Sequence, residues 1–106
     1  MTTHHKGLVS GRWQALTLAE QMGNIGSEVS RASLKQEKEK EFQSAVERAL
    51  ELFDLTLADP RWKGRCREIA RAREVFCDAA LGGGTYKNSL SDLVSYFDEF
   101  AMMARK

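Results

Sequence analysis

Apolar side chains recur at the spacing of an α-helix in separate stretches of this 106-residue chain, and this periodicity restricts the fold more than any other feature. The first stretch has intervals of four, three and four residues, which put its apolar members on one helical stripe. These members are Leu18, Met22, Ile25 and Val29. The single proline and the scarcity of Val-Thr-Tyr runs argue against strands. The pattern therefore predicts an all-α protein.

A polar stretch is predicted to lie between the first two helices. The first helix is expected over about 12–32 and the second over 39–57, whose apolar residues form a broad face. Residues 34–41 between them alternate in charge and hold no glycine or proline, so they form either a loop or a solvated extension that fuses the two helices. A short break is favoured, because a compact bundle needs the chain to reverse there.

Capping signals separate the remaining helices. Asp59 is a favoured N-cap and Pro60 a favoured first residue, which predicts a third helix over 60–81 that ends at the glycines of 82–84. The stretch 89–92 resembles a capping box that opens a fourth helix. Helices with short connections predict a four-helix bundle with antiparallel, up-down-up-down topology.

The domain organisation and compartment follow from composition. Residues 1–11 are polar and are expected to form a flexible leader, and 12–106 a single helical-bundle domain. No apolar run is long enough for a membrane span or a secretory signal. On one helix Cys66 and Cys77 would lie about 16 Å apart, too far for a disulfide. Reduced thiols indicate a cytoplasmic protein.

The residues needed for catalysis or metal binding are missing from the predicted helices. A di-iron bundle requires inward-facing Glu-x-x-His pairs, but both histidines, His4 and His5, precede the first helix. Neither cysteine has a histidine in the folded region to act as its base. The carboxylates left to ligate a metal are Glu20, Glu28, Glu47, Glu51 and Asp54. We therefore expect no enzymatic activity, metal, cofactor or small-molecule substrate.

A basic cluster on the third helix is the most suggestive local feature. Its members are Arg61, Lys63, Arg65, Arg67, Arg71 and Arg73. Lys63, Arg67 and Arg71 fall on one strip opposite the core and could contact nucleic-acid phosphates, with Trp62 or Tyr86 available for stacking. The alternative is a solvated face that pairs in part with acidic residues of the same helix.

Arg73 differs from its neighbours because it falls near the edge of the apolar stripe. A charge at that place needs a carboxylate partner. Asp54, Glu28 or Glu20 could provide it, and a buried structural ion pair is the favoured interpretation.

A row of small residues lies beside the apolar stripe of the first helix. The row consists of Ala15, Ala19, Gly23, Gly26 and Ser30. Each interior glycine costs about 1 kcal/mol relative to alanine, and close approach of another backbone would offset that cost. The row, the broad leucine face of 50–55 and the off-stripe Met102 and Met103 indicate a homo-oligomer. The alternative is that the same residues pack only within one copy.

One part of the sequence resembles a known family. The residues that carry the resemblance are Asn24-Ile25-Gly26-Ser27-Glu28, Arg31, Lys40-Glu41-Phe42 and Ala49-Leu50-Glu51-Leu52. This pattern is similar to the small four-helix-bundle proteins encoded in intervening sequences of bacterial large-subunit ribosomal RNA genes, and to the related accessory proteins of diversity-generating retroelements. It covers about 16–57; the usual small-residue and proline stretch before Asn24 is missing, and 59–64 has no counterpart.

The resemblance implies a cytosolic bundle that assembles into a ring-like homo-oligomer with no established enzymatic role. Nucleic-acid association in the related group adds to the expectation for the basic strip. The leading hypothesis is a non-enzymatic helical bundle that self-associates and binds a macromolecular partner. The alternative is a nucleic-acid-binding accessory protein that uses the strip on its third helix.

Overall fold

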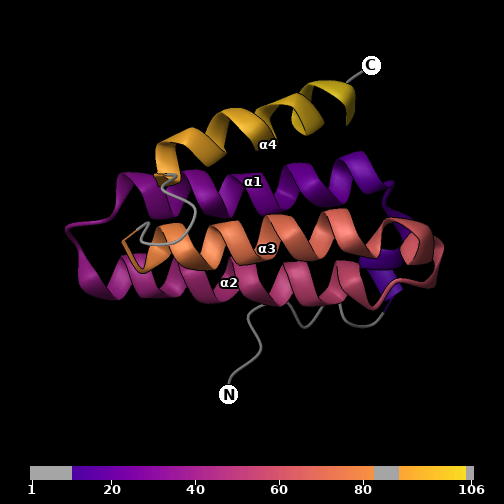
Figure 1. Ribbon diagram of the computed structural model, residues 1–106, viewed down its shortest axis with the longest axis horizontal. Helices are drawn as coiled ribbons and strands as arrows, with labels where there is room; N and C mark the ends of the chain where they lie inside the picture. The colour runs from indigo at the N-terminus through magenta and orange to yellow at the C-terminus, as the bar shows by residue number, and fades with distance from the viewer. Residues whose placement is uncertain (1–10, 83–88, 105–106) are drawn as a thin grey trace.

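The computed structural model describes residues 11–82 and 89–104, and within them the chain is helical and has no strand. Its elements are the 3₁₀ helix η2 (Trp13–Ala15), α1 (Leu18–Leu34), α2 (Glu39–Leu57), the 3₁₀ helix η3 (Pro60–Arg65), α3 (Cys66–Ala80) and α4 (Leu90–Ala104). The direction of the chain reverses from each α-helix to the next, as Figure 1 shows. The predicted all-α, up-down-up-down four-helix bundle is confirmed.

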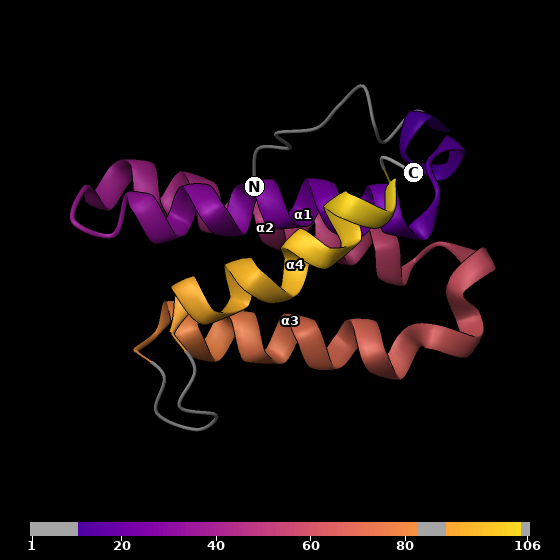
Figure 2. The ribbon, with the colours of Figure 1, turned by 90° about the horizontal axis from the view of Figure 1, so that it is seen from above.

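The fourth helix does not pack evenly on its neighbours. The helices α1, α2 and α3 run roughly alongside one another, whereas α4 crosses them obliquely (Figure 2). It begins beside the end of α3 and runs across to α1. Accordingly α4 packs extensively against α1 and only sparsely against α3. The bundle is therefore open between α3 and α4.

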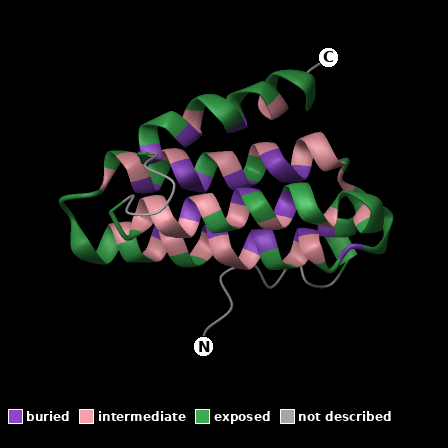
Figure 3. Ribbon diagram, viewed as in Figure 1, coloured by how far each residue is buried: buried purple, intermediate pink, exposed green. Residues whose placement is uncertain are grey.

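The core is formed by the predicted apolar stripes. Buried residues lie on the faces that the helices turn toward one another (Figure 3). At the centre, Phe53 of α2 lies 5.9 Å, centroid to centroid, from both Phe76 of α3 and Phe97 of α4. Aromatic pairs at this separation contribute about 0.5–1.5 kcal/mol each beyond the area they bury. Contacts among these three rings therefore join α2, α3 and α4 at the centre of the core.

The first helix begins later than predicted. The Glu20 backbone N–H donates to Thr17 Oγ1 at 3.1 Å, and the Thr17 N–H donates to Glu20 Oε1 at 2.9 Å. This capping box fixes the start of α1 at Leu18. The prediction of one helix over 12–32 is wrong at its start, because 13–15 form a separate 3₁₀ turn.

The turn between α1 and α2 is the short break that was favoured from the sequence. The Lys38 N–H donates to the Lys35 carbonyl at 2.9 Å, and α2 then spans 39–57 as predicted. At the other end of the chain, Asp92 N–H donates to Ser89 Oγ at 3.2 Å and Ser89 N–H to Asp92 Oδ2 at 3.0 Å. The predicted capping box of the fourth helix is confirmed.

The third helix is two elements rather than one. Asp59 caps its start as predicted, since Asp59 Oδ1 accepts from the Arg61 N–H at 3.0 Å. The backbone then winds as 3₁₀ helix, with non-helical dihedral angles at Trp62 and again at Arg65, before α3 begins at Cys66. The predicted continuous helix over 60–81 is therefore wrong. Of the three glycines expected to end it, Gly82 has a φ of +113°, and 83–84 lie outside the described residues.

The predicted leader lies almost entirely outside the described residues, which begin at Gly11. None of the helices in the described part of the chain combines the length and the apolarity needed to span a bilayer.

Candidate docking surface

A groove with a volume of about 370 Å³ lies between α3 and α4, where the bundle is open. Its residues are Glu68, Arg71, Ala72 and Val75 from α3, and Asp92, Leu93 and Tyr96 from α4. The aliphatic and aromatic side chains form the floor, and the charged residues of both signs form the rim. The groove is large enough to admit side chains of a binding partner.

The tilt of α4 that opens this groove has its origin in α1. A Cβ added to Gly23 would lie 3.4 Å from the Cα of Ala101, and one added to Gly26 would lie 2.6 Å from the Cβ of Phe97. At Gly26 only glycine leaves room for this approach, whereas the distance at Gly23 is an ordinary van der Waals contact. Gly26 therefore permits the close packing of α4 on α1, while α4 packs only sparsely against α3.

Local interactions fix the α4 side of the groove. Hydrogen bonds from the backbone and side chain of Ser89 lower the pKa of Asp92, which keeps this carboxylate charged at the groove rim. Tyr96 packs edge-on against Phe97 and Phe100, with ring centroids 5.1 and 5.5 Å away. Burial of the phenol raises the pKa of Tyr96, and the charge of Glu68 adds to this effect. The ring of Tyr96 is thus a fixed apolar surface that remains 36% exposed.

Further apolar surface continues along α4. Met102 and Met103 are 60% and 57% exposed. Met103 follows Tyr96 by seven residues, so the two lie on one side of the helix. This stripe and the groove floor together form the α4 docking surface, which consists of Ala72, Val75, Leu93, Tyr96 and Met103.

The predicted row of small residues is explained for the most part within one copy. Gly23, Gly26 and Ser30 line a cavity of about 290 Å³ that also contains Phe97 and Ala101 of α4. Ala19 is half-buried earlier on α1. Ala15 does not belong to the row, because it is exposed and lies in η2 rather than on α1. The close approach of a backbone to the glycines is thus made by α4 of the same chain.

The predicted basic strip does not have the predicted geometry. Lys63 lies in η3, before the break in α-helical geometry at Arg65, so it does not share the helical phase of Arg67 and Arg71. All three are exposed. Arg71 lies at the rim of the groove, while Lys63 and Arg67 make no ion pair within the described residues. Trp62 packs against the core, and Tyr86 lies outside the described residues.

The predicted ion pair of Arg73 exists, but it is not buried. Arg73 Nε donates to Asp54 Oδ1 at 3.0 Å, with the side chains 34% and 61% exposed. Glu28 is not a partner of Arg73; its Oε1 instead lies 3.8 Å from Arg31 Nη1 on the same helix. Glu28 itself is buried, and its Oε2 has no hydrogen-bond partner within the described residues.

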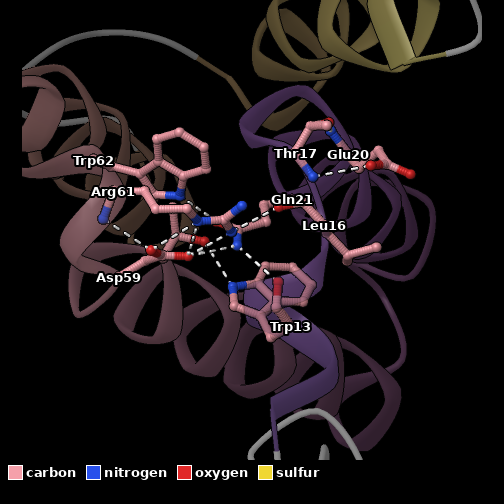
Figure 4. Close-up of polar contacts among 9 residues, drawn as sticks. Trp13, Leu16, Thr17, Glu20, Gln21, Asp59, Arg61 and Trp62 are labelled. Atoms are coloured by element: carbon pink, nitrogen blue, oxygen red, sulfur yellow. Dashed lines mark hydrogen bonds and ion pairs between the residues drawn. The ribbon is translucent and has the colours of Figure 1, made fainter.

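A buried polar network that the sequence analysis missed holds the end of the bundle where α1 begins and α2 ends. Gln21 is fully buried; its Nε2 donates to the Trp13 carbonyl at 2.9 Å and to Asp59 Oδ2 at 3.1 Å, and its Oε1 accepts from Trp62 Nε1 at 2.8 Å (Figure 4). Trp13 Nε1 donates to Thr56 Oγ1 at 3.1 Å. Because each polar group of Gln21 has a partner, its burial carries no unsatisfied group.

Arg61 completes this network from the surface. Its Nη2 donates to Asp59 Oδ2 and to the Leu16 carbonyl, both at 2.7 Å, and its guanidinium lies 4.4 Å from the centre of the Trp62 ring. The hydrogen bonds from the Arg61 side chain lower the pKa of Asp59 from 3.8 to about 2, and the Arg61 backbone N–H and Gln21 contribute in the same direction. The network is a structural clasp that joins η2, α1, α2 and η3.

The cysteines and the acidic residues are the remaining candidates for chemistry within the described residues. Cys66 and Cys77 are free and half-buried. No group of three His, Cys, Asp or Glu residues within 11–82 and 89–104 is placed to hold a metal ion. The sequence matches no family model, no curated protein and no solved structure.

Proposed function

We propose that this protein is a non-enzymatic binding module that self-associates through the α4 docking surface, with α4 of a second copy as the occupant of the groove. The observation that carries the proposal is the groove between α3 and α4, together with the exposed Met103 seven residues beyond Tyr96 on α4. A groove between two diverging helices suits a third helix, which inserts apolar side chains at helical spacing. In α4, Tyr96 and Met103 provide such side chains.

The charges around the groove are compatible with association of identical copies. In a two-fold interface, if one residue contacts a second residue of the other copy, the second residue also contacts the first across the axis. Such an interface is favourable when both signs of charge are present, as they are in Arg71, Glu68 and Asp92. A rim of one sign would instead repel its copy, and like charges brought together cost several kcal/mol.

Further expectations accompany this proposal. The resemblance to ring-forming bundle proteins suggests more than two copies, which the stoichiometry will decide. The two free thiols suit a reducing compartment, and we place the protein in the cytoplasm. A macromolecular partner then binds the assembled protein on a surface other than the α4 docking surface, which the second copy covers.

Sedimentation equilibrium tests the proposal with a matched pair of variants. Tyr96→Lys puts a charge into the groove, whereas Leu34→Lys makes a comparable change at a leucine that is 80% exposed at the end of α1. The wild type and Leu34→Lys should associate equally, and Tyr96→Lys should be about a hundredfold weaker or monomeric, as for loss of a buried aromatic anchor. A wild type that stays monomeric at millimolar concentration would exclude the proposal.

Nucleic-acid binding through the basic residues is a second proposal. It is supported by Lys63 and Arg67, which are exposed and form no ion pair within the described residues. Reversal of the charges of Lys63, Arg67 and Arg71 should abolish salt-sensitive binding to RNA or DNA. Failure of the wild-type protein to bind either nucleic acid at low salt would end this proposal.

A further inference from the structure

The side of the bundle formed by α1 and α2 carries a second feature, a cavity of about 410 Å³ surrounded by cations. Its lining residues are Arg31 and Lys35 from the end of α1, and Lys40, Glu41, Ser44 and Arg48 from the start of α2. We name this feature the cationic basin. It lies on different helices from the α4 docking surface, so it is independent of the proposed self-association.

The helical spacing brings these side chains together. Lys40, Ser44 and Arg48 follow one another at intervals of four on α2, and Arg31 and Lys35 are four apart on α1. Residues four apart lie on the same helical face, one turn from each other. Because α1 and α2 are antiparallel, the end of α1 lies beside the start of α2. Four cationic side chains and the Ser44 hydroxyl therefore line one cavity.

Internal carboxylates compensate only part of this charge. Lys35 Nζ lies 3.4 Å from Glu41 Oε2, and Arg31 Nη1 lies 3.8 Å from Glu28 Oε1. Lys40 and Arg48 form no ion pair within the described part of the chain. A surface that served only to stabilise the helices would place opposite charges four residues apart, whereas Arg31 and Lys35 repel each other.

We propose that the cationic basin binds a phosphate group, with Lys40 and Arg48 as its principal ligands and Ser44 as a hydrogen-bond donor. Arginine offers a fork of N–H donors that matches two phosphate oxygens, and lysine adds a mobile point charge. Arg31, held by Glu28, completes the basin from α1. The phosphate belongs either to a small phosphorylated molecule or to the backbone of a nucleic acid.

Calorimetric titration with inorganic pyrophosphate at low salt tests this proposal. Lys40→Gln/Arg48→Gln removes two cations from the basin, and Arg12→Gln/Lys38→Gln removes two exposed cations outside both the basin and the basic strip as the matched control. We expect saturable binding to the wild type and to the control. The affinity of the basin variant for pyrophosphate should fall by at least about tenfold, as expected for lost charge-assisted hydrogen bonds.

The outcomes separate a site from general attraction. No binding to the wild type, or equal weakening in the two double variants, would overturn the proposal. Removal of mutually repelling cations leaves the core untouched, and circular dichroism will verify that both variants are folded. A single-stranded RNA oligonucleotide identifies the source of the phosphate: competition with pyrophosphate for the basin indicates a nucleic-acid backbone, and binding of pyrophosphate without competition indicates a small phosphorylated molecule.

Discussion

Gly26 of α1 and Phe97 of α4 lie so close that a Cβ added to the glycine would stand 2.6 Å from the Cβ of the phenylalanine. Phe97 also packs against Phe53 at the centre of the core, so it cannot move away without disturbing the aromatic cluster. This contact anchors α4 on α1.

Gly26→Ala should destabilise the protein by about 1–3 kcal/mol, because overpacking exceeds the gain in helix propensity of about 1 kcal/mol. Gly23→Ala is the control, since its Cβ would lie 3.4 Å from the Cα of Ala101 and needs little adjustment. Urea unfolding monitored by circular dichroism should show Gly23→Ala at or above wild-type stability. Equal stability of the two variants would show that α4 does not depend on Gly26 for its position.

The clasp around Gln21 should be sensitive to loss of its amide. Gln21→Leu leaves the Trp13 carbonyl, Asp59 Oδ2 and Trp62 Nε1 each without one partner. The Trp13 carbonyl keeps the Leu16 N–H and Asp59 Oδ2 keeps Arg61, so only Trp62 Nε1 is left unsatisfied. The variant should therefore lose about 1–3 kcal/mol of unfolding free energy. Gln43→Leu, an exposed position on α2, should change it by less than about 0.5 kcal/mol. A small loss at Gln21 would mean that the network is dispensable.

Acid should weaken the same clasp through Asp59. The folded-state pKa of about 2 lies below the ordinary value of 3.8, so the stabilisation is complete above about pH 4 and is lost as the pH falls toward 2. The full loss amounts to up to about 2 kcal/mol. Glu20 and Asp92, whose pKa values are also lowered, contribute in this range.

Asp59→Asn separates the contribution of Asp59 from these others. The difference in unfolding free energy between wild type and variant should shrink steadily between about pH 4 and about pH 2. Urea unfolding across this range measures it. A difference that stays constant with pH would contradict the assignment of this titration to Asp59.

The ion pair between Arg73 and Asp54 should contribute little, because both side chains are partly exposed and water screens their charges. A double-mutant cycle with Arg73→Met and Asp54→Asn should give a coupling energy of about 0.2–1 kcal/mol. A coupling of several kcal/mol would restore the buried pair expected from the sequence.

Much of the fold could be predicted from the sequence because the determining signals are local. Helical periodicity identified the apolar faces, and the pairs Asp59-Pro60 and Ser89 with Asp92 marked helix starts. The later start of α1 was also visible, since Thr17 and Glu20 have capping-box spacing. The 3₁₀ geometry that removes Lys63 from the strip was not predicted, because the capping signal at Asp59-Pro60 indicates a helix start but not whether the helix that follows is α or 3₁₀.

Long-range packing could not be predicted in the same way. The sequence indicated that some backbone approaches Gly23 and Gly26, but it did not identify α4, and so it did not reveal the groove that the tilt of α4 opens. Gln21 is a polar residue adjacent to an apolar stripe, which is a usable signal for a buried polar group. Its partners Asp59 and Trp62 lie 38 and 41 residues away, and only the fold brings them together.

The occupancy of the groove by a second copy is tested most directly by isotope-filtered nuclear Overhauser spectroscopy on a mixture of ¹³C-labelled and unlabelled protein. The account predicts intermolecular contacts from the methyl groups of Val75 and Leu93 in labelled chains to the Tyr96 ring or Met103 methyl of unlabelled chains. Intermolecular contacts that avoid these four residues, or their absence from an associated sample, would contradict it.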